Sequence, residues 1–397
     1  MGREYNIVGS GSLGTANAQA RSKRDDIDII RIHTRNEKIL SGINNSHENG
    51  VYFPGVLLSP KIEAVRLDFR ELGKARGIIE FDVPGSGLNE FIDGFRPYYN
   101  GQTIVFTSKG MVLRKKQPMF PDEAIRNGLG NKTPIVFLFS PAFAKSIIKR
   151  DITFHTIASL NLSLATAVGR EIGTDEYRIT EQLDDVLGLE IVANMKNIGA
   201  IPMGMAADLG LLMSSQVGIL YECRRETLLL LEAFGGKKET LFGLANEDFW
   251  LTGLGEESRN REFGKNLARE NLRGRFRIKS TIVTLLRRWR KRKRADFLKQ
   301  AQEVYEEIII GGFVDGLHDL LVSPVIISRI LNALATSSYL EEPEGSYAVP
   351  LLLQRSLAFH LEKRLPIVTE TYNVIYGGES REIAIHNILD AIGDKYK

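Results

Sequence analysis

The first half of the chain alternates short apolar runs with segments of helical spacing or turn composition. A helix is expected over residues 13–20, directly after the first apolar run. Strands that alternate with helices are typical of a mostly parallel sheet with right-handed crossovers. The pattern therefore predicts an α/β fold whose N-terminal part is a Rossmann-type, mostly parallel sheet. The predicted strands occupy residues 5–8, 27–32, 77–83, 103–107 and 134–138.

The second half of the chain has a different pattern. After about residue 181 strand signals become rare, and residues 187–204 and 209–233 have the spacing of long helices. The region from Tyr347 to the C-terminus is similar. A chain of 397 residues is also too long for one ordinary core. We therefore predict two domains, a Rossmann domain at residues 1–180 and a mainly α-helical domain at residues 181–397.

A glycine-rich turn of the form G-x-G-x-x-G lies between the first predicted strand and the first predicted helix. In such a turn the first glycine allows a tight bend, the second admits a pyrophosphate, and the third lets helix and strand pack closely. The N-terminus of the helix adds unpaired N–H groups and partial positive charge. The first domain is therefore predicted to bind a dinucleotide through Gly9, Ser10, Gly11, Ser12, Leu13 and Gly14.

The end of the second predicted strand bears on the choice between NAD and NADP. An acidic residue there would bind the ribose 2′-hydroxyl of NAD, but the strand continues into His-Thr-Arg-Asn, and Asp26 and Asp28 lie too early. Arg35 has the charge to accept the 2′-phosphate of NADP, and a solvent-facing arginine is the alternative interpretation. We predict NAD(P)H as cofactor and favour NADP of the two.

Further short motifs agree in order and spacing with one known family. From residue 3 to about 268, and again from Glu344 to the C-terminus, the chain resembles NAD(P)-dependent glycerol-3-phosphate dehydrogenases. Several unrelated motifs in the right order are more specific than one motif alone. The motifs are VYFPGV at 51–56, VP at 83–84, TSKG at 107–110, SPAFAK at 140–145, MKN at 195–197, GLA at 243–245, Asp248, Thr252, SRNREFG at 258–264 and EG at 344–345.

The resemblance implies reversible hydride transfer between NAD(P)H and dihydroxyacetone phosphate, which gives sn-glycerol 3-phosphate for phospholipid synthesis. Reduction of a ketone needs a donor that protonates the developing alkoxide, and a lysine ammonium can do this. By its position in the motif, Lys196 is that donor. Asp248 matches the acidic partner of this lysine, and Lys109 matches a second active-site lysine. Lys196, Asp248 and Lys109 are the predicted catalytic residues.

The same resemblance assigns binding residues. Ser258 would cap a helix through Phe263 and Leu267 and so add backbone donors for a phosphate. The predicted substrate-binding residues are Lys109, Asn197, Thr252, Ser258, Arg259 and Asn260. Besides the glycine turn, the predicted cofactor-binding residues are Arg35, Pro84, Lys109, Ala144, Arg259 and Glu344.

Three features depart from the family pattern. Ser140 stands where the family has a glycine, and Ala142 stands where its motif has a serine. The segment Asn246-Glu247 is one residue shorter than usual, so Glu247 competes with Asp248 for the role of catalytic carboxylate. The segment at about 269–342 is much longer than in family members.

This insertion contains a strongly basic run, RRWRKRKR, which begins at Arg287 and ends at Arg294. The formal net charge of the chain is +3, so without these seven cations the remainder would carry −4. Such a run can contact anionic lipid head groups, nucleic acid or an acidic partner, or it can be a solvated face. We expect weak membrane or acidic-partner contact at most, and no specific nucleic acid.

Composition limits the remaining possibilities. The hydrophobic share of 43% and the charged share of 25% are ordinary for a globular protein, and no apolar run approaches the roughly 18 residues of a membrane span. Cys223 is the single cysteine, and the six histidines have no metal-ligand spacing. We therefore expect a soluble cytoplasmic protein without a metal site. A homodimer is implied by the family resemblance.

Two other functions fit the same architecture. Related two-domain dehydrogenases act on hydroxy acids, whose carboxylate would not need the Arg259-Asn260 pair. A cofactor-binding sensor or scaffold without catalysis is motivated by the changes at Ser140 and near Asp248, and opposed by the intact Lys109 and Lys196.

Overall fold

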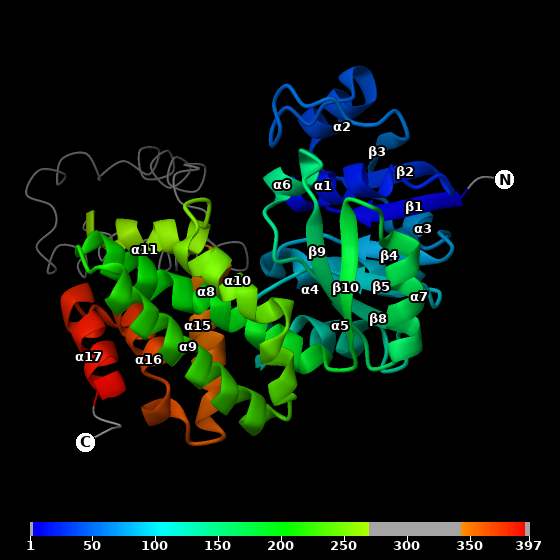
Figure 1. Ribbon diagram of the computed structural model, residues 1–397. Helices are drawn as coiled ribbons and strands as arrows, with labels where there is room; N and C mark the ends of the chain where they lie inside the picture. The colour runs from blue at the N-terminus through cyan, green and yellow to red at the C-terminus, as the bar shows by residue number, and fades with distance from the viewer. Residues whose placement is uncertain (1–2, 270–342, 394–397) are drawn as a thin grey trace, which may run out of the picture.

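The computed structural model describes residues 3–269 and 343–393 of the chain. A sheet flanked by helices forms one half of the molecule, and a bundle of helices forms the other half (Figure 1). The basic run from Arg287 to Arg294, and all of the predicted insertion except its first residue, lie outside the described residues.

The N-terminal half is built on an eight-stranded sheet in the order β10-β9-β8-β5-β4-β1-β2-β3. All neighbouring strands are parallel except β8 and β9, which confirms the predicted mostly parallel sheet. The strands are β1 (Arg3–Val8), β2 (Ile27–Thr34), β3 (Ile62–Arg66), β4 (Ile78–Phe81), β5 (Thr103–Phe106), β8 (Ile135–Phe139), β9 (Thr153–Ala158) and β10 (Tyr177–Leu183). A small hairpin of β6 (Val112–Arg114) and β7 (Gln117–Met119) stands apart from the sheet.

The five predicted strands all form, but β3, β6, β7, β9 and β10 were not predicted. β3 and β10 are the two outer strands of the sheet. In β10 exposed residues alternate with buried or half-buried ones along the strand, so its apolar signal is weak. The apolar pattern therefore detected five inner strands of the sheet, and missed both outer strands, the inner strand β9 and the separate hairpin.

Helices connect the strands on both faces of the sheet. The face that carries Phe81, Phe106 and Phe137 shares one apolar core with the helical half of the molecule. The opposite face packs against α1 and α7 in a separate core. The helices of this half are α1 (Ser12–Arg21), α2 (Glu37–Ser46), α3 (Phe69–Leu72), α4 (Gly85–Phe95), η1 (Arg96–Tyr98), α5 (Pro121–Leu129), α6 (Ala144–Ile148) and α7 (Leu162–Ile172).

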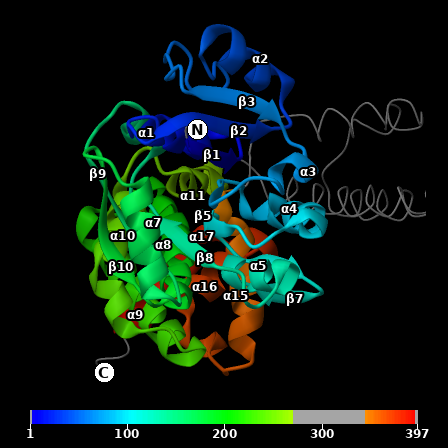
Figure 2. The same cartoon turned by 90° about the vertical axis from the view of Figure 1, so that its right-hand side faces the viewer.

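The helical half is organised around α8 (Val186–Asp208), which begins three residues after the end of β10. α8 is buried along nearly its whole length and has helices on all sides, as expected for a helix without a polar face. Figure 2 shows the same arrangement from the side. The surrounding elements are α9 (Met213–Phe234), η2 (Lys238–Phe242), α10 (Leu244–Leu254), α11 (Arg259–Arg269), α15 (Glu344–Leu357), η3 (Glu362–Arg364), α16 (Pro366–Tyr372), η4 (Asn373–Gly377) and α17 (Arg381–Gly393).

The long helices α8 and α9 confirm the two helices predicted at residues 187–204 and 209–233. Within α8, Gly204 allows a close approach of α11, because a Cβ there would lie 2.0 Å from the carbonyl oxygen of Arg261. In the described part of the chain, none of the helices has the length and apolar character that crossing a membrane requires.

Candidate active site

The glycine turn has the geometry that a pyrophosphate needs. Gly9 has a φ of +115°, and a Cβ on it would lie 2.3 Å from the carbonyl oxygen of Asp82. A Cβ on Gly14 would lie 2.0 Å from the carbonyl oxygen of Gly9. By contrast, a Cβ on Gly11 would meet no described atom within 4 Å. The turn is thus closed toward the sheet and open on its outer side.

The open side of the turn leads to the N-terminus of α1. Gly11 is the N-cap residue, and no side chain of the described residues caps this helix. Ser12 and Leu13 form its first turn, while the Ser10 hydroxyl lies 2.6 Å from the Thr34 hydroxyl at the end of β2. The first backbone N–H groups of α1 have no side-chain cap among the described residues, and the open side of the turn lets a ligand approach them closely. This arrangement fits the binding of a dinucleotide pyrophosphate.

The other predicted cofactor residues of the first domain follow the carboxyl ends of neighbouring strands. Pro84 is the N-cap of α4, after β4, and Ala144 is the first residue of α6, after β8. Arg35 follows β2 and is exposed, with its guanidinium 2.6 Å from the Glu90 carboxylate on α4. In parallel sheets this edge, where the strand order reverses, is where ligands bind.

Lys196 forms a buried polar cluster with two residues of α10. Its Nζ lies 2.5 Å from Asp248 Oδ2 and donates a hydrogen bond to Thr252 Oγ1 at 3.2 Å. Thr252 Oγ1 in turn donates to Asp248 Oδ1 at 3.1 Å. All three side chains are buried. Because a buried ion pair is costly to desolvate and adds little net stability, its presence in an apolar helix points to a functional role.

The shortened segment Asn246-Glu247 lies in the first turn of α10, and Asp248, the next residue, faces the lysine. Asp248 is 1% exposed, whereas Glu247 is exposed and accepts a hydrogen bond from the neighbouring Asn246. Of the two candidate carboxylates, Asp248 is therefore the one that contacts Lys196.

Lys109 approaches Lys196 from the other half of the molecule. It follows β5, and its Nζ lies 5.1 Å from the centre of the Phe139 ring, while Lys196 Nζ lies 5.8 Å from the same centre. Burial and the nearby charge of Lys196 lower the pKa of Lys109 to about 8, although Asp248 and Glu344 oppose the shift. Two amines with different environments, one from each half of the molecule, thus lie near the same aromatic ring.

Ser140, which stands where the family motif has a glycine, still provides a hydrogen-bond acceptor for Lys109. Lys109 Nζ donates to the main-chain carbonyl oxygen of Ser140 at 3.3 Å. Because the acceptor belongs to the backbone, a serine provides it as well as a glycine does. Phe139, which lies under both lysines, was not predicted; as an apolar residue at a strand end it carries no signal in the sequence.

A second polar cluster joins α8, α11 and α15. Asn197 Nδ2 donates to Glu344 Oε2 at 3.3 Å, and Asn260 Nδ2 donates to Asn197 Oδ1 at 3.1 Å. The backbone N–H of Gly345 donates to Asn260 Oδ1 at 2.9 Å. A Cβ on Gly345 would lie 2.6 Å from the carbonyl oxygen of Asn197, so the close approach requires glycine. The predicted residues Asn197, Asn260 and Glu344 are therefore neighbours.

Ser258 directly precedes α11, at the position expected of a helix cap. Its Oγ accepts a hydrogen bond from the backbone N–H of Arg261 at 3.3 Å, which confirms its role as a helix cap. Arg259 is the first residue of this helix and is exposed. Among the residues that the structure describes, no cluster of His, Cys, Asp and Glu could hold a metal ion.

Comparison with protein families gives two matches that follow each other along the chain. Residues 5–165 match the model of the NAD-dependent glycerol-3-phosphate dehydrogenase N-terminus, and residues 185–303 match the model of its C-terminus.

Individual proteins agree with these matches. A glycerol-3-phosphate dehydrogenase (NAD(P)+) of Solidesulfovibrio magneticus is 30% identical over 266 residues, which are 66% of this chain and 79% of the relative. One from Methylobacterium radiotolerans is 29% identical over 264 residues, 66% of this chain and 77% of the relative. In fold, the chain is similar to the crystal structure of glycerol-3-phosphate dehydrogenase from Coxiella burnetii, with a TM-score of 0.72, 21% identity and coverage of 98% and 99% of the two chains.

Proposed function

Because the chain belongs to the NAD-dependent glycerol-3-phosphate dehydrogenase family, we propose that it reduces dihydroxyacetone phosphate to sn-glycerol 3-phosphate, reversibly, with NAD(P)H. The observation that carries this proposal is the buried Lys196–Asp248–Thr252 cluster, which faces Lys109 from across the domain boundary. A ketone oxygen between these groups would meet ammonium donors on the side where negative charge develops.

Lys196 is the proposed proton donor. Its contact with Asp248 orients the ammonium group, and Thr252 links the two side chains. As the carbonyl carbon C2 gains a hydride, the oxygen gains negative charge, and Lys196 supplies the proton that makes it a hydroxyl. In the reverse direction the neutral amine takes that proton back.

Lys109 and the start of α11 are proposed to hold the substrate. The ammonium of Lys109 would polarise the carbonyl or bind the phosphate, and it keeps this charge below a pH of about 8. Arg259 and the N-terminal N–H groups of α11 provide donors for a phosphate group. Asn197 and Asn260 support this arrangement through their mutual hydrogen bond and the bond from Gly345.

The cofactor is proposed to lie along the carboxyl edge of the sheet, with its pyrophosphate at the turn from Gly9 to Gly14. NAD(P)H supplies the hydride when it is bound. Arg35 supports a preference for NADP, because its exposed guanidinium lies beyond β2, where a 2′-phosphate would be bound. Pro84, Ala144, Arg259 and Glu344 are proposed to complete the site.

Three further proposals follow from family membership. We propose a homodimer, a cytoplasmic location, and a product that supplies phospholipid synthesis. Weak contact of the run from Arg287 to Arg294 with anionic lipid or an acidic partner stays a proposal, because the run lies outside the described residues.

The experiment that tests the proposed function follows oxidation of NADH and of NADPH in parallel. Dihydroxyacetone phosphate is offered beside a 2-keto acid and a 3-keto acid. We expect turnover with dihydroxyacetone phosphate, and loss of turnover with retained dinucleotide binding in Lys196→Ala. Activity with a keto acid alone would support a hydroxyacid dehydrogenase instead. Dinucleotide binding without turnover of any substrate by the wild type would support a sensor.

A further inference from the structure

A set of buried polar side chains lies directly beneath the glycine turn. Glu80 is on β4, and Asp82 follows its end; both are buried. Asn17 on α1 connects them, since its Nδ2 donates to Glu80 Oε1 at 2.9 Å and to Asp82 Oδ2 at 3.0 Å. Thr107 Oγ1 donates to Asp82 Oδ1 at 2.5 Å. The set thus contains two carboxyl groups within reach of one amide.

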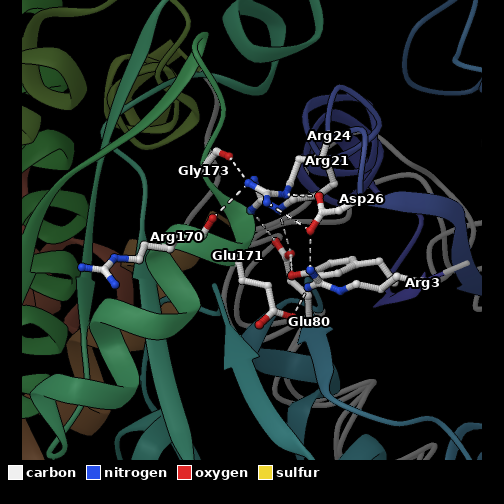
Figure 3. A network of polar contacts seen from close by, with 9 residues as sticks. Arg3, Arg21, Arg24, Asp26, Glu80, Arg170, Glu171 and Gly173 are labelled. Carbon is white, nitrogen blue, oxygen red and sulfur yellow. Dashed lines mark hydrogen bonds and ion pairs between the residues drawn. The ribbon is translucent and has the colours of Figure 1, made fainter.

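Only one of these two carboxyl groups has a cation as partner among the described residues. Arg21 donates from Nη2 to Glu80 Oε1 at 3.3 Å (Figure 3). It also donates from Nη1 to the carbonyl oxygen of Ile172 at 3.1 Å, and it is fully buried. Tyr5 donates its hydroxyl to Glu80 at 2.7 Å. The charge of Glu80 is therefore balanced by Arg21. The hydrogen-bond partners of the Asp82 side chain, Asn17 and Thr107, are neutral.

A buried carboxyl group without a cationic partner favours its neutral form. Burial and the negative charge of Glu80 raise the pKa of Asp82 to about 8, against the hydrogen bonds from Thr107 and Asn17, which favour the carboxylate. The charged or titratable groups that act on Asp82 within the described chain include Glu80 on β4, Arg21 on α1 and Tyr177 on β10. Arg21 also stacks over the Tyr177 ring at 4.3 Å.

Asp82 is in contact with the turn itself. A Cβ on Gly9 would lie 2.3 Å from the Asp82 carbonyl oxygen, and a Cβ on Gly14 would lie 3.2 Å from Asp82 Cβ. The backbone N–H of Asp82 donates to the carbonyl oxygen of Val8 at 2.8 Å, which ties β4 to β1 at their carboxyl ends. A charge on Asp82 would therefore act on the same ligand phosphates that the turn and the N-terminus of α1 receive.

We propose that Asp82 is a positioning residue of the dinucleotide site, which supports binding as a neutral carboxylic acid and weakens it as a carboxylate. As a neutral acid it supports the turn without placing negative charge beneath the pyrophosphate. As a carboxylate it repels the phosphates and opposes the partial positive charge at the start of α1. This inference rests on the proposed function, because it requires a dinucleotide at the turn.

The test measures the dissociation constant of NADPH directly, by fluorescence titration of the wild type and Asp82→Asn from about pH 6 to about pH 9.5, a range that spans the expected ionisation. Asparagine has the shape of the acid and cannot ionise. We expect equal affinities at the acid end, and at about pH 9 roughly tenfold weaker binding by the wild type than by the variant, one pH unit above the pKa. Lys109 titrates in the same range and affects both proteins. The readout is therefore the ratio of the NADPH dissociation constants of the wild type and Asp82→Asn at each pH.

Identical pH profiles of the wild type and Asp82→Asn would overturn the proposal. A loss of affinity in the variant that is the same at every pH would also overturn it, because it would indicate a structural role alone. Asp390→Asn, which removes an exposed carboxylate of α17, is the matched control and should keep the wild-type profile. No NADPH binding by the wild type at any pH would overturn the proposed cofactor itself.

A second variant keeps the test valid if Asp82→Asn does not fold, as judged by circular dichroism. Thr107→Val removes the hydroxyl that donates to Asp82 Oδ1. Because this hydrogen bond favours the carboxylate, its loss should move the weakening of NADPH binding to higher pH. An unchanged midpoint in Thr107→Val would contradict the role of Asp82.

Discussion

Arg355 at the end of α15 forms a two-pronged ion pair with Glu123 at the start of α5, with Nη1–Oε2 and Nη2–Oε1 distances of 2.5 Å and 2.8 Å. The guanidinium also lies 4.7 Å from the centre of the Phe120 ring and 5.0 Å from that of Phe234. α15 begins at Glu344 in the candidate active site, whereas α5 belongs to the sheet domain. The pair therefore joins the two halves whose residues meet at Lys109 and Lys196.

Replacement of Arg355 by methionine should weaken the contact between the two halves of the molecule. The fork-like pairing and the contacts with two aromatic rings are lost, so we expect a decrease of about 1–2 kcal/mol in the free energy of unfolding. Urea unfolding followed by circular dichroism measures it. Arg355→Lys, which keeps the charge but not the fork, should have an intermediate effect, and equal stability of Arg355→Met and wild type would contradict the interpretation.

Asp248→Asn should lower kcat by about 10²-fold, because Lys196 then loses the carboxylate that orients its ammonium group. Glu247→Gln is the matched control, since Glu247 precedes it in the chain but is exposed and contacts Asn246. Steady-state assays with dihydroxyacetone phosphate compare the two variants. A larger loss in Glu247→Gln than in Asp248→Asn would reverse the assignment of the catalytic carboxylate.

The rate of substrate reduction should depend on the ionisation of Lys109. Its pKa is lowered to about 8. Lys109 is therefore fully protonated at lower pH and loses its proton as the pH rises through that value. We expect kcat/KM for dihydroxyacetone phosphate to fall above about pH 8, by up to about tenfold per pH unit. A pH profile measures this.

Lys109→Arg provides the comparison for this profile, because arginine keeps its charge throughout the range. Its kcat/KM should be lower than that of the wild type and should lack the decrease near pH 8. A decrease that persists unchanged in Lys109→Arg would assign the ionisation to another group.

Arg35→Ala should raise KM for NADPH and leave KM for NADH unchanged. A charge-assisted contact with a phosphate is worth about 1.5–3 kcal/mol, which corresponds to about tenfold or more. Arg66→Ala is a suitable control, since Arg66 is also an exposed arginine at the carboxyl end of a strand and pairs with Glu37. Equal effects of Arg35→Ala on both cofactors would refute selection of the 2′-phosphate by Arg35.

Local sequence patterns were sufficient for several parts of the fold. The central strands are buried on both faces and so appear as continuous apolar runs, and the glycine turn is defined by residues that are adjacent in the chain. The outer strand β10 was missed because every second residue along it is exposed. The lysines and Asp248 of the candidate site were found only through resemblance to a family, not from periodicity.

By itself, the sequence determined the strand–turn–helix unit at the glycine turn, the mostly parallel sheet and the helical second half, because these follow from the apolar periodicity and turn residues within short segments. Only the tertiary structure decided which polar groups share a buried space. Lys109 and Lys196 lie 87 positions apart in the sequence. The partners of Glu80 come from β1 and α1, and those of Asp82 from α1 and the residue after β5. Burial and charge pairing between distant segments set the ionisation of these groups, and no local pattern encodes that environment.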